Sequence, residues 1–224
     1  MSDVPEPIPS ATVVLLRDGA RDIEVLLLQR SPRKGKPGPW VFPGGRVEPH
    51  DITDSDPYSE RSARAAAIRE THEEAGLRIE SAPLETISRW ITPPVAPRRF
   101  DTWFFIGTRP ADEPVQVDGD EMSDHRWLSP TEILMAFGRK ELSLAPPTFV
   151  TVTWLEEFAR ADEAVAQLAA RELVTFRPLI LRTNEGSMVM LYPGDAGYEA
   201  ADPQAQGARH RCHALEHGFS YERS

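Results

Sequence analysis

The 224-residue sequence has a single cysteine, few basic residues and no long apolar run. One thiol, Cys212, cannot form an intrachain disulfide, which favours a reducing compartment and excludes a multi-cysteine zinc framework. The longest aliphatic runs, 13–16 and 25–28, are far shorter than the ~20 residues of a membrane-spanning helix. Lysine and arginine number 25 against 35 acidic residues, a net charge of −10, so we expect neither nucleic acid nor a membrane as a partner. Any bound phosphate must then be met by a few local groups or a metal.

At 40% apolar residues the chain is able to bury a core, as one large domain or one domain with an appendage. Residues 1–9 are acidic and proline-rich, with no basic segment ahead of an apolar stretch, so we expect no export signal and a cytoplasmic protein. We expect residues 1–10 to be flexible, residues 11–173 to form the main domain, and residues 174–224 to form a β-rich extension packed on it.

The first half of the sequence indicates a mixed α/β domain. Two apolar runs, 11–17 and 23–30, flank a turn-forming segment and predict a hairpin. Residues 59–75 lack proline and glycine and are followed by Gly76, a residue typical of a helix C-cap, so they predict a helix. Further strands are expected at 77–79, 85–91, 100–107 and 125–128.

The second half begins with a short helix predicted from Ser129-Pro130. A longer helical stretch is expected from Pro146 toward residue 173, with a break near 161–162. Apolar residues recur there at helical spacing, which predicts a stripe that packs on the sheet: Val150, Trp154, Leu155, Phe158 and Ala161. Strands are expected at 174–182 and 188–192, followed by a polar stretch.

That polar stretch contains a cluster of potential metal ligands: His210, Cys212, His213 and His217. The spacing fits a metal site if the segment is helical. A weakly ordered polar tail is the preferred interpretation. For the extension as a whole, closure over a cleft and a contact in a homodimer both stay open.

An acidic cluster in the predicted helix carries the chemistry. Glu70, Glu73 and Glu74 stand at i, i+3 and i+4, so their carboxylates converge on one face. Arg69 reaches Glu73 at i+4, but one guanidinium cannot neutralise three carboxylates, which leaves room for a divalent cation. Oxygen ligands favour Mg²⁺ or Mn²⁺ over zinc.

The run Arg69-Glu70-Thr71-His72-Glu73-Glu74-Ala75-Gly76-Leu77, preceded by Phe42-Pro43-Gly44-Gly45, resembles the signature of the Nudix hydrolases. This resemblance implies an α/β/α sandwich with a mixed sheet, followed here by C-terminal helices and the β-rich tail. The sequence departs from the signature in three ways. Asp51 stands in place of the first glutamate, about ten extra residues around 52–61 lengthen the turn, and Thr71 replaces an aliphatic residue. Asp51, Glu48 and Glu60 are therefore all candidates for the missing carboxylate.

The resemblance also implies roles for individual residues. Glu70, Glu73 and Glu74 would be metal ligands with backbone help from Gly45, and Arg69 would orient them. A further acidic residue from a later loop, best matched by Glu121, would act as ligand or base. The implied reaction is attack of metal-activated water on a diphosphate linkage, with Glu70 or Glu121 as general base.

Residues 27–45 look like the segment that identifies the coenzyme A diphosphatases of this superfamily. CoA or acyl-CoA is therefore the favoured substrate class, ahead of ADP-ribose, NADH or another nucleoside diphosphate derivative. Four basic residues are candidates for contacts with such a ligand: Arg30, Lys34, Arg98 and Arg99. Trp90 and Trp103 are interpreted as core residues rather than adenine platforms. The alternative from another class is a non-catalytic Nudix-fold binding or sensor protein.

Overall fold

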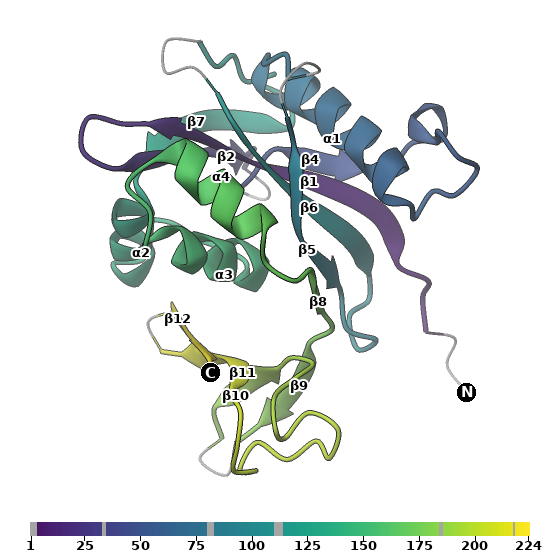
Figure 1. Cartoon of the computed structure of the whole chain (residues 1–224), viewed down its shortest axis with the longest axis vertical. Helices are drawn as coiled ribbons and strands as arrows, with labels where there is room; N and C mark the ends of the chain where they lie inside the picture. The colour runs from purple at the N-terminus through teal and green to yellow at the C-terminus, as the bar shows by residue number, and fades with distance from the viewer. Residues whose placement is uncertain (1–3, 33–34, 80–82, 110–113, 184–185, 217) are drawn as a thin grey trace.

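The computed structural model describes residues 4–32, 35–79, 83–109, 114–183, 186–216 and 218–224 (Figure 1). Lys34 lies outside the described residues. Within those ranges eight strands form a mixed sheet, in the order β3–β2–β1–β6–β5–β8, with β4 paired to β1 and β7 paired to β2. These strands are β1 (Ile8–Asp18), β2 (Ile23–Arg30), β3 (Trp40–Val41), β4 (Gly44–Arg46), β5 (Glu85–Ile91), β6 (Phe100–Thr108), β7 (Met122–Leu128) and β8 (Val174–Phe176).

Helices cover both faces of this sheet. Alternate residues of β1 point to opposite faces, so Val13 and Leu15 pack in a core with helix α1 (Glu60–Ala75). Val14 and Leu16 join the other core, with α2 (Pro130–Gly138), α3 (Pro146–Leu155) and α4 (Ala161–Ala169). The predicted α/β/α sandwich with a mixed sheet is therefore confirmed.

The sheet splits between its first two strands. β1 and β2 pair only at residues 16–18 and 23–25, as the predicted hairpin requires. Farther from the turn, residues 10–12 of β1 pair with β4, while Leu28 and Gln29 of β2 pair with β3. The segment from β3 to β4 thus wedges into the split. β1 begins at Ile8, so the end of the segment expected to be flexible belongs to a strand.

Helix α1 has the predicted bounds. The Ser59 hydroxyl accepts a hydrogen bond from the Ser62 N–H at the N-terminus, and Gly76 takes the left-handed conformation at the C-terminus, φ 69°. The strand predicted at 77–79 is wrong: Leu77 and Ile79 are buried but belong to no strand. Their apolar side chains fill the core without backbone pairing.

The C-terminal helices begin as expected but break earlier. Ser129 caps α2 in a capping box with Glu132. The long helical stretch is two helices, separated at 156–160 rather than near 161–162. The carboxylate of Asp18, from the β1–β2 hairpin, accepts the backbone N–H of Ala161 and so caps α4.

The C-terminal extension, called the tail from here on, forms an antiparallel sheet of its own, with the strand order β12–β11–β10–β9. Its strands are β9 (Leu179–Arg182), β10 (Met188–Leu191), β11 (His210–Leu215) and β12 (Gly218–Arg223). The strand predicted at 174–182 is two strands with Pro178 between them, of which β8 pairs with β5 of the main sheet. The prediction of a weakly ordered polar stretch after the strand expected at 188–192 is also wrong, because residues of this stretch form β11 and β12.

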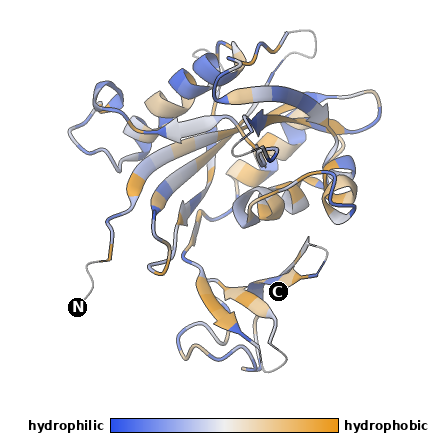
Figure 2. Ribbon diagram, turned by 180° about the vertical axis from the view of Figure 1, so that it is seen from behind, coloured by the Kyte–Doolittle hydropathy of each residue, from blue (hydrophilic) through white to orange (hydrophobic). Residues whose placement is uncertain are grey.

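The tail sheet packs on the main domain through aromatic rings. Trp90 stacks on Phe176 at a centroid distance of 3.8 Å, and Tyr192 meets both rings edge-on. Phe219 of β12 contacts Phe137 of α2. Figure 2 shows hydrophobic residues along the tail strands. No helix in the described residues is long and apolar enough to cross a membrane.

Candidate active site

The tight turn between β3 and β4 brings backbone groups to the acidic face of α1. Two donors fix the Pro43 carbonyl: the Thr12 hydroxyl at 2.8 Å and the Val13 N–H at 2.9 Å. Gly44 has φ 152°, and a Cβ there would lie 2.3 Å from the Ala11 carbonyl oxygen, so only glycine fits. Its N–H donates to Oε2 of Glu74 at 2.8 Å.

Gly45 lies close to a different neighbour. A Cβ on Gly45 would lie 2.2 Å from Oε1 of Glu70 and 2.3 Å from its carboxyl carbon. The carboxylate of Glu70 therefore lies directly against the backbone of β4. The turn thus contacts two glutamates of the cluster, Glu74 through the N–H of Gly44 and Glu70 through the space that a side chain on Gly45 would fill.

Arg69 is the hub of the cluster. Its guanidinium donates to Asp51 Oδ2 at 2.9 Å and to Glu73 Oε2 at 2.7 Å, and lies 3.0 Å from Glu70 Oε1. A fourth contact, 3.0 Å, is made to the Arg46 carbonyl oxygen. Burial disfavours the charged guanidinium, but the carboxylates around it raise the pKa of Arg69 above its ordinary value. The arginine expected to orient the glutamates therefore contacts two of them and a third acid besides.

Asp51 is that third acid, and it reaches Arg69 in spite of the lengthened turn. It is buried at the end of a short 3₁₀-helix, η1 (Pro49–Asp51), where its carboxylate accepts the Glu48 N–H at 2.9 Å. Glu60 lies in the first turn of α1, where it pairs with Arg64 and accepts from Thr86. Of the three candidates for the missing glutamate, Asp51 is the one that engages Arg69.

The extra residues of the turn are ordered against the start of β1. The Tyr58 hydroxyl donates to the Pro7 carbonyl at 2.9 Å, and Trp103 Nε1 donates to the Tyr58 carbonyl at 2.9 Å. Thr71, which replaces an aliphatic residue, is fully buried with its hydroxyl bonded to the Ala67 carbonyl. Neither departure from the family signature disturbs the cluster.

Glu74 is the most buried of the three glutamates, at 3% exposure. Burial raises its pKa to about 8, against the opposing influence of the Gly44 N–H and Arg30. Burial also raises the pKa of Glu70, which Arg69 only partly offsets. Oε1 of Glu74 has no hydrogen-bond partner among the described residues. The cluster therefore contains more carboxyl groups than its arginines could neutralise if all were ionised.

Arg30 and Glu121 border the cluster from the ends of β2 and β7. An Arg30 nitrogen lies 3.6 Å from a Glu121 carboxylate oxygen and another lies 4.0 Å from Glu74 Oε1. The Glu121 carboxylate also raises the pKa of both Glu70 and Glu74. Its side chain is 68% exposed, so it stands at the open side of the cluster.

Arg98 and Arg99 make their contacts elsewhere. The Arg99 guanidinium donates to the carbonyls of Thr92 and Pro5, and that of Arg98 lies over the Phe100 ring. The interpretation of Trp90 as a core residue is supported by its 4% exposure. Of the four basic residues predicted to contact the ligand, the structure brings Arg30 to the cluster.

The oxygen ligands of the cluster are of the kind that a hard divalent cation prefers. Their side chains are not grouped as a ready metal site. The described residues contain no ready group of three acidic, histidine or cysteine side chains that could hold a metal. Nη1 of Arg69 lies 3.0 Å from an oxygen of Glu70 and 2.7 Å from an oxygen of Glu73, so the guanidinium engages both carboxylates. The unpartnered buried oxygen of Glu74 and the all-oxygen donors nevertheless match the ligands that Mg²⁺ and Mn²⁺ prefer.

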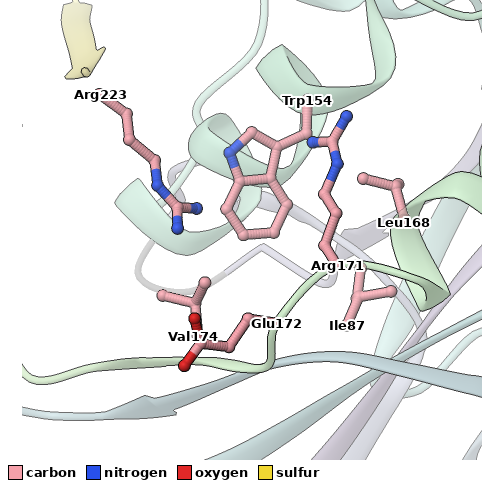
Figure 3. A pocket seen from close by; sticks show the side chains of 7 residues that line it. All are labelled: Ile87, Trp154, Leu168, Arg171, Glu172, Val174 and Arg223. Atoms are coloured by element: carbon pink, nitrogen blue, oxygen red, sulfur yellow. The ribbon is translucent and has the colours of Figure 1, made fainter.

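The described residues of the tail supply no competing metal site. His210 and Cys212 point to one face of β11 and His213 to the other, as alternation along a strand requires, so the helix on which a metal site depended is not formed. His217 lies outside the described residues. A cavity between tail and main domain is only about 10 Å³, roughly one water (Figure 3). It is lined by Ile87, Trp154, Leu168, Arg171, Glu172, Val174 and Arg223.

Sequence reasoning had no signal for several residues that support the cluster. Thr12, Arg46 and Asp118 act through long-range or backbone hydrogen bonds that leave no short motif. Asp51 was identified only as a departure from the family pattern. Its contact with Arg69 depends on how the lengthened turn folds.

Comparisons with known proteins identify the family of this chain. Residues 6–150 match the NUDIX domain family model. The chain is 32% identical over 197 residues to the acyl-coenzyme A diphosphatase NUDT19 of Homo sapiens, covering 83% of this chain but 50% of the relative, so it spans about half that protein's length. The Xenopus laevis protein of the same name is 25% identical, covering 86% and 76%. The solved structure of a NUDIX hydrolase from Alicyclobacillus acidocaldarius is 25% identical with a TM-score of 0.64, covering 75% of this chain and 99% of that one. On the matched domain and the glutamate–glycine geometry together, the chain belongs to the Nudix family.

Proposed function

We propose that this protein is a metal-dependent hydrolase that cleaves a diphosphate linkage in a nucleoside diphosphate derivative. The observation that carries the proposal is the meeting of Glu70 and Glu74 with the backbone of Gly44 and Gly45 in a Nudix chain. Burial raises the pKa of both carboxylates, and a bound cation would offset that cost of ionisation.

Three glutamates would hold Mg²⁺ or Mn²⁺, namely Glu70, Glu73 and Glu74, with the Gly45 carbonyl as a further ligand. The bound cation supplies charge neutralisation at the phosphate oxygens and lowers the pKa of a water molecule. Arg69 keeps Glu70 and Glu73 in place from one side while Asp51 holds Arg69. Arg30 is held by two long ion pairs, at 3.6 and 4.0 Å, and is therefore able to turn toward a phosphate.

Glu121 is the better candidate for general base. Glu70 is held between Arg69 and the backbone of Gly45, an arrangement suited to a ligand. Glu121 is exposed and its ion pair with Arg30 is long, at 3.6 Å, so its carboxylate is able to accept a proton from water. If Arg30 turns toward the phosphate of a bound substrate, its ion pair with Glu121 is broken. The Glu121 carboxylate would then be available when the substrate is bound.

CoA or acyl-CoA is the substrate class that we favour. Two relatives with the name acyl-coenzyme A diphosphatase align with more than four-fifths of this chain, which supports this class over ADP-ribose or NADH. The proposal also uses the segment 27–45, whose residues supply Arg30 and both glycines of the site. The cytoplasmic location and the homodimer stay predictions from the sequence.

The test is a substrate panel with purified protein and Mg²⁺ or Mn²⁺: CoA, acetyl-CoA, ADP-ribose, NADH and diadenosine polyphosphates. We expect metal-dependent release of 3′,5′-ADP from CoA, lost in Glu73→Gln. Cleavage of ADP-ribose or NADH instead would keep the reaction and overturn the substrate class. Binding without turnover of any compound would contradict the enzyme and favour a non-catalytic module.

A further inference from the structure

The backbone that carries Glu121 is fixed by a single neighbouring side chain. Oδ1 of Asp118 accepts the backbone N–H groups of Asp120 at 2.6 Å, Glu121 at 2.7 Å and Met122 at 3.1 Å. Gly119, at φ 78°, closes the turn by donating its N–H to the Met122 carbonyl at 3.0 Å. One carboxylate oxygen thus organises the whole turn 118–122.

Both ends of this turn are tied to the elements that build the acidic cluster. On one side the Gln116 N–H donates to the carbonyl of Ala75, the last residue of α1. On the other side Met122 is fully buried, and the Glu121 carbonyl accepts the N–H of Ser31 at 2.8 Å. The turn is therefore fixed in position relative to the elements that build the cluster of Glu70 and Glu74.

The side chain of Glu121 has no such support. It is 68% exposed, and its ion pair with Arg30 is long at 3.6 Å. Packing does not select its position, so the direction in which its carboxylate points depends on the backbone beneath it. A preorganised backbone is what an exposed catalytic side chain needs to keep a productive geometry.

We propose that Asp118 is a positioning residue, which fixes the backbone of Glu121 and thereby aims its carboxylate at the acidic cluster. The part of this inference that concerns catalysis rests on the proposed function and on Glu121 as its base. The hydrogen bonds that Asp118 accepts in this turn all come from backbone N–H groups, so the turn requires an acceptor oxygen at this position. The substitution Asp118→Asn retains such an oxygen, whereas Asp118→Ala removes it.

The experiment uses the full chain and compares Asp118→Ala, Asp118→Asn and a matched control, Asp120→Ala. Asp120 lies in the same turn and carries the same charge, and it contributes its N–H rather than an acceptor. The first readout is the rate of hydrogen exchange of the amides of residues 120–122, which NMR monitors. We expect faster exchange in Asp118→Ala and exchange near that of the native chain in the other two. Unchanged exchange in Asp118→Ala would overturn the proposal, whether or not the protein is active.

The second readout is turnover of the substrate identified in the panel. We expect kcat to fall about tenfold in Asp118→Ala with KM nearly constant, and to be restored in Asp118→Asn. In a Glu121→Gln background, Asp118→Ala should cause no further loss, because the residue acts through Glu121. Full additivity of the two substitutions would overturn the positioning role. Absence of turnover in the native chain would refute the proposed function and leave the exchange result to decide the role of Asp118 in the turn.

Discussion

Two buried carboxylates in this molecule have pKa values that move in opposite directions. Asp195 lies in the tail and Glu74 lies in the acidic cluster, and both are at most 5% exposed. The pKa of Asp195 is lowered to about 2, whereas that of Glu74 is raised to about 8. Burial opposes ionisation at both sites, so the difference comes from their partners.

Asp195 has all the partners that a carboxylate can use. Arg211 donates to both of its oxygens, at 2.7 and 2.6 Å, and the N–H groups of His210 and Gly197 add one bond to each. The remaining Arg211 nitrogen donates to the Pro203 carbonyl. This pair is closed to further ligands and ties the loop 193–209 to β11, so its function is structural.

Glu74 receives one hydrogen bond from the described residues, and its second oxygen is buried without a partner among them. Around it, two arginines face five acids: Arg69 and Arg30 against Asp51, Glu70, Glu73, Glu74 and Glu121. An incomplete set of partners, rather than burial or acidity, distinguishes the site at which we propose a bound cation from the ion pair in the tail.

The largest expected effect is on catalysis in the cluster. Glu70→Gln removes one charge without changing shape, and we expect kcat to fall about 1000-fold because a ligand of the cation is lost. The melting temperature should hardly change, since Glu70 contributes repulsion as well as its contact with Arg69. Steady-state kinetics and thermal unfolding measure the two quantities. A large loss of stability with full activity would reverse our assignment of the two sites.

The second prediction concerns the stability that the pair of Asp195 and Arg211 gives to the tail. Asp195→Asn leaves Arg211 buried without its counter-charge, and we expect the free energy of unfolding to drop by about 3 kcal/mol. Activity per folded molecule should remain, because the described contacts of this pair all lie in the tail. Glu199→Gln, an exposed acid of the same loop, is the control and should change stability by less than about 0.5 kcal/mol. Equal effects of the two variants would refute the structural role of the pair.

Acid should remove the stabilisation that the same ion pair provides. The pKa of Asp195 is about 2 in the folded protein against 3.8 in the unfolded reference, so its stabilisation is complete above about pH 5 and is lost as pH falls toward 2. The loss amounts to about 2 kcal/mol. The quantity to measure is the difference in unfolding free energy between the native chain and Asp195→Asn, from urea titrations at several pH values. A difference that grows as the pH is lowered would contradict the lowered pKa.

The smallest effect concerns the close approach of β4 to α1. Gly45→Ala places a methyl group where the Glu70 carboxylate lies, so Glu70 must shift, and we expect kcat to fall about tenfold. Gly138→Ala is the matched control, because a Cβ there meets no atom of the described residues within 4 Å. Equal kinetics for the two variants would mean that the position of Glu70 against the turn is not needed for turnover.

Local sequence signals predicted the parts of the fold that local physics decides. Ser59 and Gly76 mark the ends of α1, and the spacing of Glu70, Glu73 and Glu74 set their shared face. Tertiary contacts decided the rest. Residues 77–79 have strand-like composition but fill the core without pairing, and β11 and β12 are too polar to be recognised before they pair with β10 and with each other.

The same division holds at the site. The glutamates and Arg69 form a motif, and Arg30 was identified from its neighbourhood to the turn. The contact between Asp51 and Arg69 spans 18 positions with an ordered insertion between them, and no spacing rule anticipates it. Arg98 and Arg99 were selected for their charge, but the carbonyls of Thr92 and Pro5 and the Phe100 ring engage them instead.

We propose that the acidic cluster lacks positive charge because a divalent cation binds there. Titration of the protein with Mn²⁺, followed by the loss of the free-ion EPR signal, tests it most directly. We predict that the native chain and Asp195→Asn bind Mn²⁺ with similar affinity, and that Glu74→Gln binds it much more weakly. Equal binding by Glu74→Gln and the native chain would contradict the account.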